Sequence, residues 1–327
     1  MASPTPSICC PTDRLMIARV VRSGVVEAVH DGAVAAVDRS GNVVATSGDV
    51  DRRFFARSAV KPFQTYTALR FGGEMPPEHV AVVSASHGGD PVHIATVRAI
   101  LAGAGLDETL LRCPPDWPLS STAARRVAAA AAPERIWHNC SGKHAAMLRA
   151  SAVQGWPLET YVDPTHPLQQ ANHELIAEVT GEDPSPVGVD GCGAPVFQIS
   201  TLGLARAFAR FASEPRFRDI WTAMHRFPML ASGLDGADAA IARSIDAAAK
   251  RGAEGLLGVA VRNQMGVVVK VWDGAKRGAG VGMISALDQL GLLPGSARTA
   301  LASMARPPVL GGGLPVGHME PVLRLVT

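Results

Sequence analysis

Strand-like segments at both ends of the chain, separated by a long helical middle, constrain the fold more than any other feature. Near the N-terminus, short β-branched runs alternate with Gly, Asn and Asp turns, a pattern typical of an antiparallel meander. The predicted strands there cover residues 17–21, 25–30, 33–38 and 43–47. In the middle, Ala and Leu recur mostly at helical spacing, which predicts helices at 92–104, 123–132, 144–153, 168–179, 202–212 and 217–227. Strands then return at 256–261 and 267–272, followed by a helix at 278–290 and a last strand at 319–326.

This order predicts an α/β (α+β) fold with an antiparallel sheet built from N- and C-terminal strands, flanked by helices and carrying a helical insert. We expect residues 1–13 to form a flexible tail and residues 14–327 a single domain. Its α/β lobe would span about 14–90 and 250–327, and its mainly helical lobe about 91–249. Residues 307–315, with three consecutive glycines, predict a loop.

Composition excludes several classes of protein. Lys and Arg number 31 against 29 Asp and Glu, and only 5% of residues are aromatic, so neither a basic footprint nor a stacking platform for nucleic acid is expected. The longest apolar runs fall well short of the roughly 20 residues that span a bilayer, so no membrane association is expected. Five cysteines at irregular positions make a poor disulfide framework and indicate a reducing, cytoplasmic location.

Ser58 and Lys61 lie three residues apart at the start of a predicted helix that runs to Leu69. This spacing brings two side chains together across one helical turn, where a neutral lysine can accept the serine proton. A structural role is the alternative: Ser58 as an N-cap, with Pro62 in the first turn and Lys61, as the residue before a proline, outside the helical region.

Ser86 and His87 follow an apolar run at 80–83 that predicts a strand. A strand ending in a hydroxyl, an imidazole and the glycines 88 and 89 is a suitable edge for an active site. The alternative is a turn in which Ser86 and Asp90 bond only to local backbone.

Cys140 precedes a predicted helix, and Cys192 lies between two glycines after a short strand. A helix N-terminus favours a thiolate, so Cys140 is a candidate nucleophile or metal ligand. Two cysteines supply half of a tetrahedral zinc site. The candidates for the remaining ligands are Lys143, His138, His144 and Asp190. Two inert, buried thiols are the alternative.

Lys250 begins a Lys-x-Gly segment just before a predicted strand. This pattern is similar to the Lys-Thr-Gly box of penicilloyl-serine enzymes, in which the lysine shapes the field around the nucleophile. A helix C-terminus capped by Gly252, with Lys250 and Arg251 complementing the helix dipole, is the alternative.

Taken together, five segments in this order resemble the rhizobial-type L-asparaginases of the asparaginase II family. The matches are residues 57–62 (RSAVKP), 85–87 (ASH), 138–144 (HNCSGKH), 190–195 (DGCGAP) and 250–255 (KRGAEG). The similarity extends from about residue 15 to the C-terminus. It implies a fold similar to serine β-lactamases and glutaminases, hydrolysis of L-asparagine to L-aspartate and ammonia, and a homodimer.

The resemblance also implies roles for single residues. Ser58 with Lys61, and Ser86 with Lys250, would form two catalytic Ser-Lys tandems. A zinc ion would be held by Cys140, Lys143 and Cys192. The substrate would be contacted by Arg57, His87, Asp190 and His144. The family pattern after Ser86-His87 is Ser-Gly-Glu, where this chain has Gly88-Gly89-Asp90. The segment between Cys192 and Lys250 is compressed, so Lys270 and Lys276 are alternatives for the second tandem.

The sequence therefore predicts an amidohydrolase, specifically an L-asparaginase, in which Ser58 or Ser86 attacks the side-chain amide and a neutral lysine takes the proton. Which of the two attacks stays open. The alternatives are a glutaminase, another Ser-Lys amidohydrolase of the same fold, or a non-catalytic protein that binds zinc or an amino acid. The near-neutral charge fits a small zwitterionic substrate.

Overall fold

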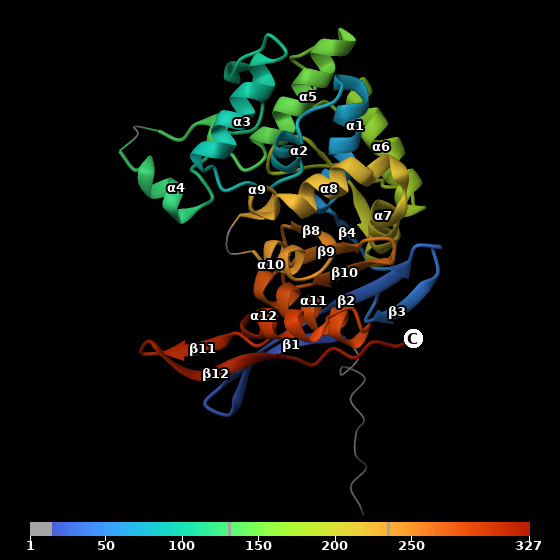
Figure 1. Ribbon diagram of the computed structural model, residues 1–327, viewed down its shortest axis with the longest axis vertical. Coiled ribbons are helices and arrows are strands. Elements are labelled where there is room, and N and C mark those ends of the chain that lie inside the picture. Colours follow the sequence, from blue (N-terminus) through green and yellow to red (C-terminus); the bar gives the residue numbers. More distant parts are fainter. Residues whose placement is uncertain (1–14, 130–131, 234–235) are drawn as a thin grey trace, which may run out of the picture.

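A computed structural model of the chain describes residues 15–129, 132–233 and 236–327. The predicted tail at 1–13, with Cys9 and Cys10, lies outside the described residues, as does part of the helix predicted at 123–132. The remaining elements form a large sheet with helices on both faces and a mainly helical part beyond one of those faces (Figure 1).

The sheet has eight strands, all paired antiparallel, in the order β11-β12-β1-β2-β10-β9-β8, with β3 also beside β2. The strands are β1 (Met16–Arg22), β2 (Val25–Asp38), β3 (Val43–Ser47), β8 (Ala247–Gly252), β9 (Leu256–Val261), β10 (Met265–Val271), β11 (Pro308–Gly311) and β12 (Leu314–Pro321). Strands from the first and last parts of the chain therefore share one sheet, which confirms the predicted fold class.

The strand β2 is longer than predicted. A turn was expected at Asp31-Gly32, yet β2 continues through both residues. A Cβ atom at position 32 would lie 2.2 Å from the Lys270 carbonyl oxygen and 2.7 Å from the Ile17 side chain. Glycine is needed there because neighbouring chain segments approach closely, and this prediction of a turn was wrong.

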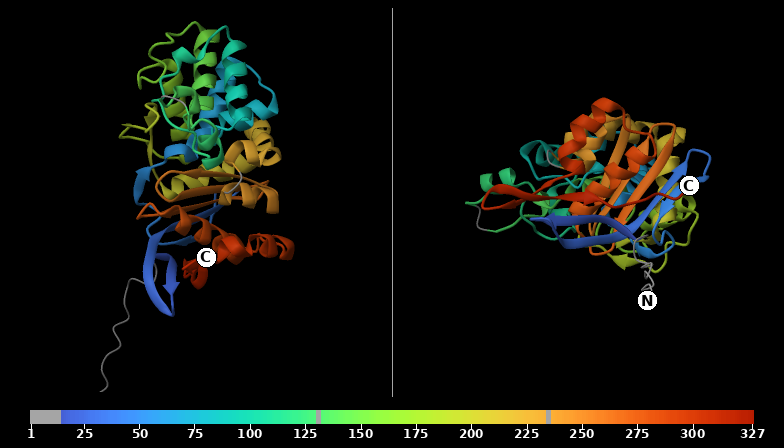
Figure 2. Two further views of the ribbon diagram at one scale, coloured as in Figure 1. Left: turned by 90° about the vertical axis from the view of Figure 1, so that its left-hand side faces the viewer. Right: turned by 90° about the horizontal axis from the view of Figure 1, so that it is seen from below.

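Helices cover both faces of the sheet because side chains alternate along each strand. Val268 of β10 belongs to the core under α7 (Thr201–Ser213) and α8 (Arg218–Arg226), whereas its neighbour Val267 belongs to the opposite core. The second core is closed by α10 (Ala237–Ser244), α11 (Lys276–Gln289) and α12 (Gly295–Ala305). Figure 2 shows these layers from the side and from below.

A third core lies within the helical part. Its surrounding elements are α1 (Lys61–Gly72), α2 (Pro77–Val83), α3 (Pro91–Ala102), α5 (Ser141–Gln154), α6 (Pro167–Thr180) and α9 (Pro228–Ser232), whereas no residue of α4 (Ser121–Arg126) belongs to it. The strand predicted at 80–83 was wrong, because this segment is the end of helix α2. Its apolar run packs between helices, and Pro77 at the first helical position starts the helix. A short apolar run is ambiguous between the two structures.

The C-terminal region also differs from the prediction. The loop expected at 307–315 is a β-hairpin formed by β11 and β12, with its turn at Gly312 and Gly313. Within the described parts of the chain, no helix is long and apolar enough to cross a membrane.

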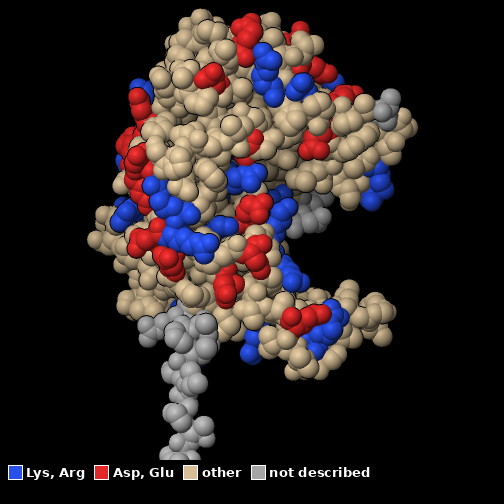
Figure 3. Space-filling view, turned by 180° about the vertical axis from the view of Figure 1, so that it is seen from behind, with Lys and Arg blue, Asp and Glu red and all other residues tan. Residues whose placement is uncertain are grey.

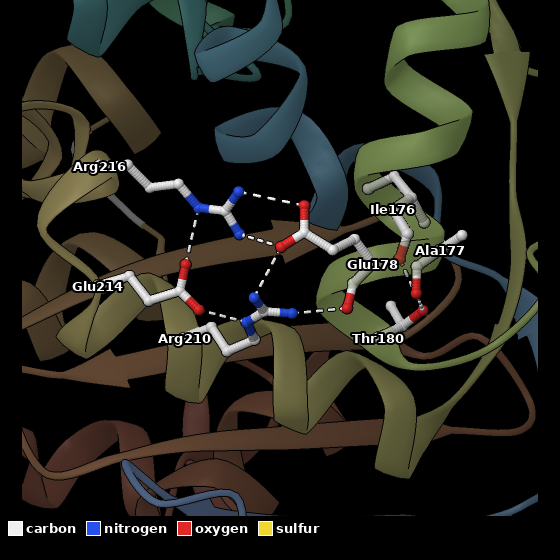
Figure 4. Close-up of polar contacts among 7 residues, drawn as sticks. All are labelled: Ile176, Ala177, Glu178, Thr180, Arg210, Glu214 and Arg216. Atoms are coloured by element: carbon white, nitrogen blue, oxygen red, sulfur yellow. Dashed lines mark hydrogen bonds and ion pairs between the residues drawn. The ribbon is translucent and has the colours of Figure 1, made fainter.

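An ion-pair network ties helix α6 to the end of helix α7 (Figure 4). Glu178 of α6 lies 2.7 Å from Arg210 and 2.6 Å from Arg216. Glu214 pairs with both arginines from the other side. Because these ion pairs are partly exposed, they add little to the free energy of unfolding, and their main effect is to fix the orientation of the two helices.

Candidate active site

Ser86 lies between two lysines. Its Oγ is 3.2 Å from Nζ of Lys61, which begins helix α1, and 3.1 Å from Nζ of Lys250, which belongs to the edge strand β8. Both amines also donate to backbone oxygens, Lys61 to Ala85 at 2.5 Å and Lys250 to Arg251 at 2.7 Å. All three side chains are buried. The structure therefore brings together one hydroxyl and two amines from three distant segments.

Burial, together with the charge of Lys61, lowers the pKa of Lys250 well below its ordinary value. No carboxylate among the described residues is within ion-pair distance of either amine. Two positive charges on one hydroxyl would repel each other, so the neutral form of Lys250 is favoured. A neutral amine in contact with a hydroxyl can accept its proton.

Ser58 lies one turn before Lys61, in the 3₁₀ helix η2 (Arg57–Val60) that runs directly into α1. Lys61 keeps helical backbone angles although Pro62 follows it, and neither η2 nor α1 is capped by a serine side chain. The N-cap role considered for Ser58 was therefore wrong. Its side chain is half-buried, unlike that of Ser86, and the structure records no hydrogen bond for its hydroxyl among the described residues.

Arg57, the residue before Ser58, has a positive φ of 48°. Non-glycine residues adopt this conformation at a cost, and such strain concentrates at functional sites. Arg57 is held by Asp190, whose Oδ1 lies 2.5 Å from its Nε. Glu254, which also has a positive φ, lies 3.9 Å from the guanidinium. The strained segment thus positions Ser58 at the start of the helix.

Lys143, Cys140 and Cys192 form a second cluster. Nζ of Lys143 lies 3.3 Å from Sγ of Cys192, and the Cys140 thiol donates to the Asn139 side-chain oxygen at 3.1 Å. Interaction with the Cys140 thiol and the Lys143 charge lower the pKa of Cys192, while interaction with Cys192 and burial raise the pKa of Cys140. Although burial opposes its charge, the two sulfurs raise the pKa of Lys143. Negative charge is therefore favoured on Cys192 and positive charge on Lys143.

His144 adjoins this cluster and is fully buried. Its Nδ1 lies 2.6 Å from the Tyr161 hydroxyl, and its Nε2 has no hydrogen-bond partner among the described residues. His138 instead uses its Nδ1 to accept from the Cys140 backbone N–H. Tyr161 was not found from the sequence, because a lone tyrosine in a loop carries no spacing signal.

The two clusters are joined through backbone and side-chain contacts. Lys61 reaches the Asn139 carbonyl oxygen, one residue before Cys140, at 3.5 Å. Asp190, two residues before Cys192, holds Arg57 beside Ser58. The five sequence segments singled out above therefore lie around one centre.

His87 has hydrogen-bond partners other than the lysine-serine centre. It is fully buried, its Nε2 lies 3.0 Å from the Ser141 hydroxyl, and its Nδ1 accepts from the Gly89 N–H. Burial lowers the pKa of His87 well below its usual range. Both ring nitrogens are engaged, so the ring anchors the backbone that follows Ser86.

The alternative lysines lie elsewhere. Lys270 donates to the Glu254 and Val271 carbonyl oxygens, and Lys276 is exposed at the first turn of helix α11. Of the three lysines considered for the second tandem, Lys250 is the one in contact with Ser86.

A cleft of about 940 Å³ opens beside this centre. Gly88 and Asp90, which follow Ser86, line it together with Arg251 and Gly252, which follow Lys250. Figure 3 shows a hollow in the surface of the molecule. The side chains of Ser86, Lys61 and Lys250 do not line the cleft, so it adjoins the lysine-serine centre without containing it.

The sequence model of the L-asparaginase II family matches residues 18–321. The chain belongs to this family. Membership confirms the predicted family and, at the level of the family, the predicted enzyme class of amidohydrolases. A comparison with curated proteins gave no match.

Among solved structures, this L-asparaginase II family member is distantly similar to Mglu and to a probable glutaminase, ybaS. Mglu in its native form is 15% identical, with 81% of this chain and 65% of that chain covered and a TM-score of 0.46. Mglu in its glutamate form is 14% identical over 80% and 61% of the two chains, with a TM-score of 0.47. The ybaS protein is 16% identical over 80% and 85%, with a TM-score of 0.39. The chain spans less than two thirds of these two Mglu structures.

Proposed function

We propose that this protein is an L-asparaginase that hydrolyses the side-chain amide of L-asparagine to L-aspartate and ammonia. The observation that carries the proposal is the contact of one buried serine, Ser86, with two lysine amines, next to a second serine on the same helical turn as Lys61. Such a centre supplies a nucleophile and a general base without a carboxylate. Family membership supports the amide as the reacting group.

Ser58 is the better candidate for the attacking serine. It is half-buried, its hydroxyl is free of hydrogen bonds to the described residues, and it lies at a helix start where backbone N–H groups stabilise a developing oxyanion. Ser86 would pass one proton from Lys61 to the neutral Lys250, and the Lys61 amine, now neutral, would take the proton of Ser58. Ammonia then leaves, and water hydrolyses the acyl-enzyme.

The charges around Ser58 suit an α-amino acid. Arg57 can bind the α-carboxylate and Asp190 the α-ammonium group, because the two side chains lie side by side with opposite charges. His144 would approach the substrate through its unpaired Nε2. For His87 we propose a positioning role on the backbone of Ser86 rather than direct contact.

The donor atoms of Cys140, Lys143 and Cys192 fit zinc, since they offer two sulfurs and an amine nitrogen, with Lys143 Nζ 3.3 Å from the Cys192 sulfur and the buried His144 ring beside this pair. No set of three His, Cys, Asp or Glu side chains in the described residues has a metal-binding arrangement, so the site depends on the lysine. Cys140 and Lys143 must each lose a proton to bind. When bound, zinc would supply Lewis acidity or orient the substrate.

Zinc content tests the proposed metal site separately from activity. We expect one zinc per chain in elemental analysis of the wild type and little in Cys192→Ser, with Cys113→Ser as the matched control. Cys113 is also a buried thiol, but it donates to the Arg135 carbonyl oxygen. Equal metal content in all three proteins would refute the site.

Substrate identity is tested by ammonia release from L-asparagine and L-glutamine. We expect faster release from asparagine; a preference for glutamine would favour a glutaminase. Binding of asparagine in calorimetry without turnover would favour a non-catalytic amino-acid-binding protein.

A homodimer and a cytoplasmic location are also proposed. Light scattering of the purified protein tests the homodimer.

The attacking serine is identified by a reactive asparagine analogue that leaves a stable ester. We expect the label on the peptide that contains Ser58, in wild type and in Ser86→Ala. A label on the peptide that contains Ser86 would reverse the two roles.

A further inference from the structure

Asp238 is the one acidic residue that is buried in the described parts of the chain. It lies at the start of helix α10, and its carboxylate forms an ion pair of 3.2 Å with the Arg251 guanidinium. Its oxygens also accept hydrogen bonds from the backbone N–H groups of Ala239 and Arg251, at 3.2 and 3.4 Å. Replacing a buried ion pair by apolar residues is often neutral for stability, so stability alone does not account for Asp238.

Asp238 is connected to Lys250 through Arg251, the next residue of strand β8. Asp238 binds both the backbone N–H and the guanidinium of Arg251, and the guanidinium also donates to the Ser232 carbonyl oxygen at 2.7 Å. The carbonyl oxygen of Arg251 in turn accepts from the Lys250 amine at 2.7 Å. Strand β8 is the last of its sheet, so its outer edge has no strand beside it among the described residues. Asp238 therefore fixes the backbone that holds the Lys250 amine near Ser86.

The chain closes tightly over this ion pair at Gly236. A Cβ atom at this position would lie 2.1 Å from Nη1 of Arg251 and 2.2 Å from Oδ1 of Asp238. Any side chain there would displace the pair, so the contact requires glycine. The Arg251 side chain is 30% exposed, and both members of the pair line the cleft beside the lysine-serine centre. The ion pair is therefore covered by backbone at Gly236 and borders the cleft.

The charges that act on Lys250 come from four places in the chain. Burial, which is the largest effect, and the charge of Lys61 lower the pKa of Lys250. Asp238 acts in the opposite direction and is the largest of the effects that raise this pKa. Arg251 lowers it further, and Cys140, just before helix α5, raises it. Without the Asp238 carboxylate, the Arg251 guanidinium would add an uncompensated positive charge beside an ammonium group that is already disfavoured.

We propose that Asp238 is a positioning residue for Lys250: it fixes the Arg251 backbone that binds the Lys250 amine, and it cancels the guanidinium charge so that the amine can receive a proton. The proposal rests on the proposed function, in which a proton passes from Lys61 through Ser86 to Lys250. Asp238 acts through Arg251, since no hydrogen bond or ion pair joins Asp238 to Lys250 in the described parts of the chain.

The protonation of Lys250 can be measured by NMR without substrate. The chain contains five lysines, so full-length protein labelled with ¹³C at the lysine Cε gives few resonances, and Lys250→Met assigns the one from Lys250. Its chemical shift is followed across the pH range in which circular dichroism shows the proteins to be folded. We expect the Lys250 resonance to titrate at a lower pH in Asp238→Asn than in the wild type, because the Arg251 charge is no longer cancelled.

Two further variants separate the effect of charge from a general effect on structure. Asp238→Asn combined with Arg251→Met removes both members of the ion pair, and we expect its midpoint to return toward the wild-type value. Asp246→Asn is the matched control, because Asp246 directly precedes strand β8 and pairs with Arg262 at 3.0 Å on the surface. Its midpoint should equal that of the wild type.

Equal midpoints in the wild type and Asp238→Asn would overturn the proposal, as would a shift that the double variant retains. A Lys250 that does not titrate in the folded wild type would also overturn it, because Asp238 would then not keep the amine able to take a proton.

Turnover provides a second measurement. Asp238→Asn should lower kcat for asparagine about tenfold or more with little change in KM. A rise in KM alone would overturn the positioning role and assign Asp238 to substrate binding. No turnover by the folded wild type would contradict the proposed function, whereas the shift of the Lys250 midpoint would still support the contact of Asp238 with Arg251 as the control of Lys250.

Discussion

Replacing Lys250 by methionine separates the chemistry of the site from the stability of the fold. The side chain is fully buried in strand β8, and its amine contacts the Ser86 hydroxyl and the Arg251 carbonyl oxygen. Methionine has a similar length and fills irregular core space. Lys250→Met therefore removes the amine with little change in packing, and we expect kcat/KM to fall by a factor of about 10² to 10⁴.

The effect of Lys250→Met on stability depends on pH in a defined direction. The pKa of Lys250 is lowered by burial, so between that value and about 10.4 the unfolded chain binds a proton that the folded chain does not. The free energy of unfolding of the wild type therefore rises with pH in this window, by up to about 1.4 kcal/mol per pH unit from this group. Lys250→Met also loses two hydrogen bonds. Each loss lowers its free energy of unfolding by about 0.5–1.5 kcal/mol, and this amount does not vary with pH.

Urea unfolding of both proteins at a series of pH values between 7 and 10 provides the measurement. The free energy of the wild type minus that of Lys250→Met should increase as the pH rises. A difference that stays constant, or that decreases with pH, would show that Lys250 is charged in the folded protein and would refute its role as a neutral base.

Three further predictions concern the core, the substrate and pH. Phe63→Ala should lower the free energy of unfolding by about 3–5 kcal/mol in urea, because the ring has edge contacts with Phe208, Phe211 and Phe217 at centroid distances of 5.6–6.2 Å; a loss below about 1 kcal/mol would contradict this. Asp190→Asn should raise KM for asparagine by roughly tenfold or more, since it removes the charge beside Arg57; an unchanged KM would exclude the contact. Activity should increase toward alkaline pH, because Lys143, whose pKa is raised by the two sulfurs, must lose its proton to hold zinc, and an optimum below neutral would count against the proposed zinc site.

Much of the fold could be predicted because its signals are local. Alternating β-branched residues and Gly-containing turns located β1, β3, β9 and β10, and their positions at the two ends of the chain indicated one shared sheet. The errors came from tertiary contacts that a local pattern does not contain. Gly32 was interpreted as a turn residue, but it allows close packing against Lys270 and Ile17. The valines at 80–83 were interpreted as a strand, but they pack among helices.

In the candidate site, too, local signals could be predicted from the sequence and tertiary contacts could not. The three-residue spacing of Ser58 and Lys61 predicted that they share a helical turn. It could not predict that the amines of Lys61 and Lys250 both contact the Ser86 hydroxyl. That contact depends on how strand β8 packs against η2, the 3₁₀ helix that leads into α1. Likewise, the pairing of Arg57 with Asp190 across 133 residues needed the folded chain. Residue types indicated the chemistry, and the fold determines which groups meet.

The most direct test of the proposed function is ammonia release from L-asparagine by the wild type and by Ser58→Ala, with circular dichroism showing that both are folded. We predict turnover by the wild type and a fall in kcat on the order of 10³-fold or more in the variant. Full activity in Ser58→Ala, or no ammonia from the folded wild type, would contradict a Ser-Lys asparaginase.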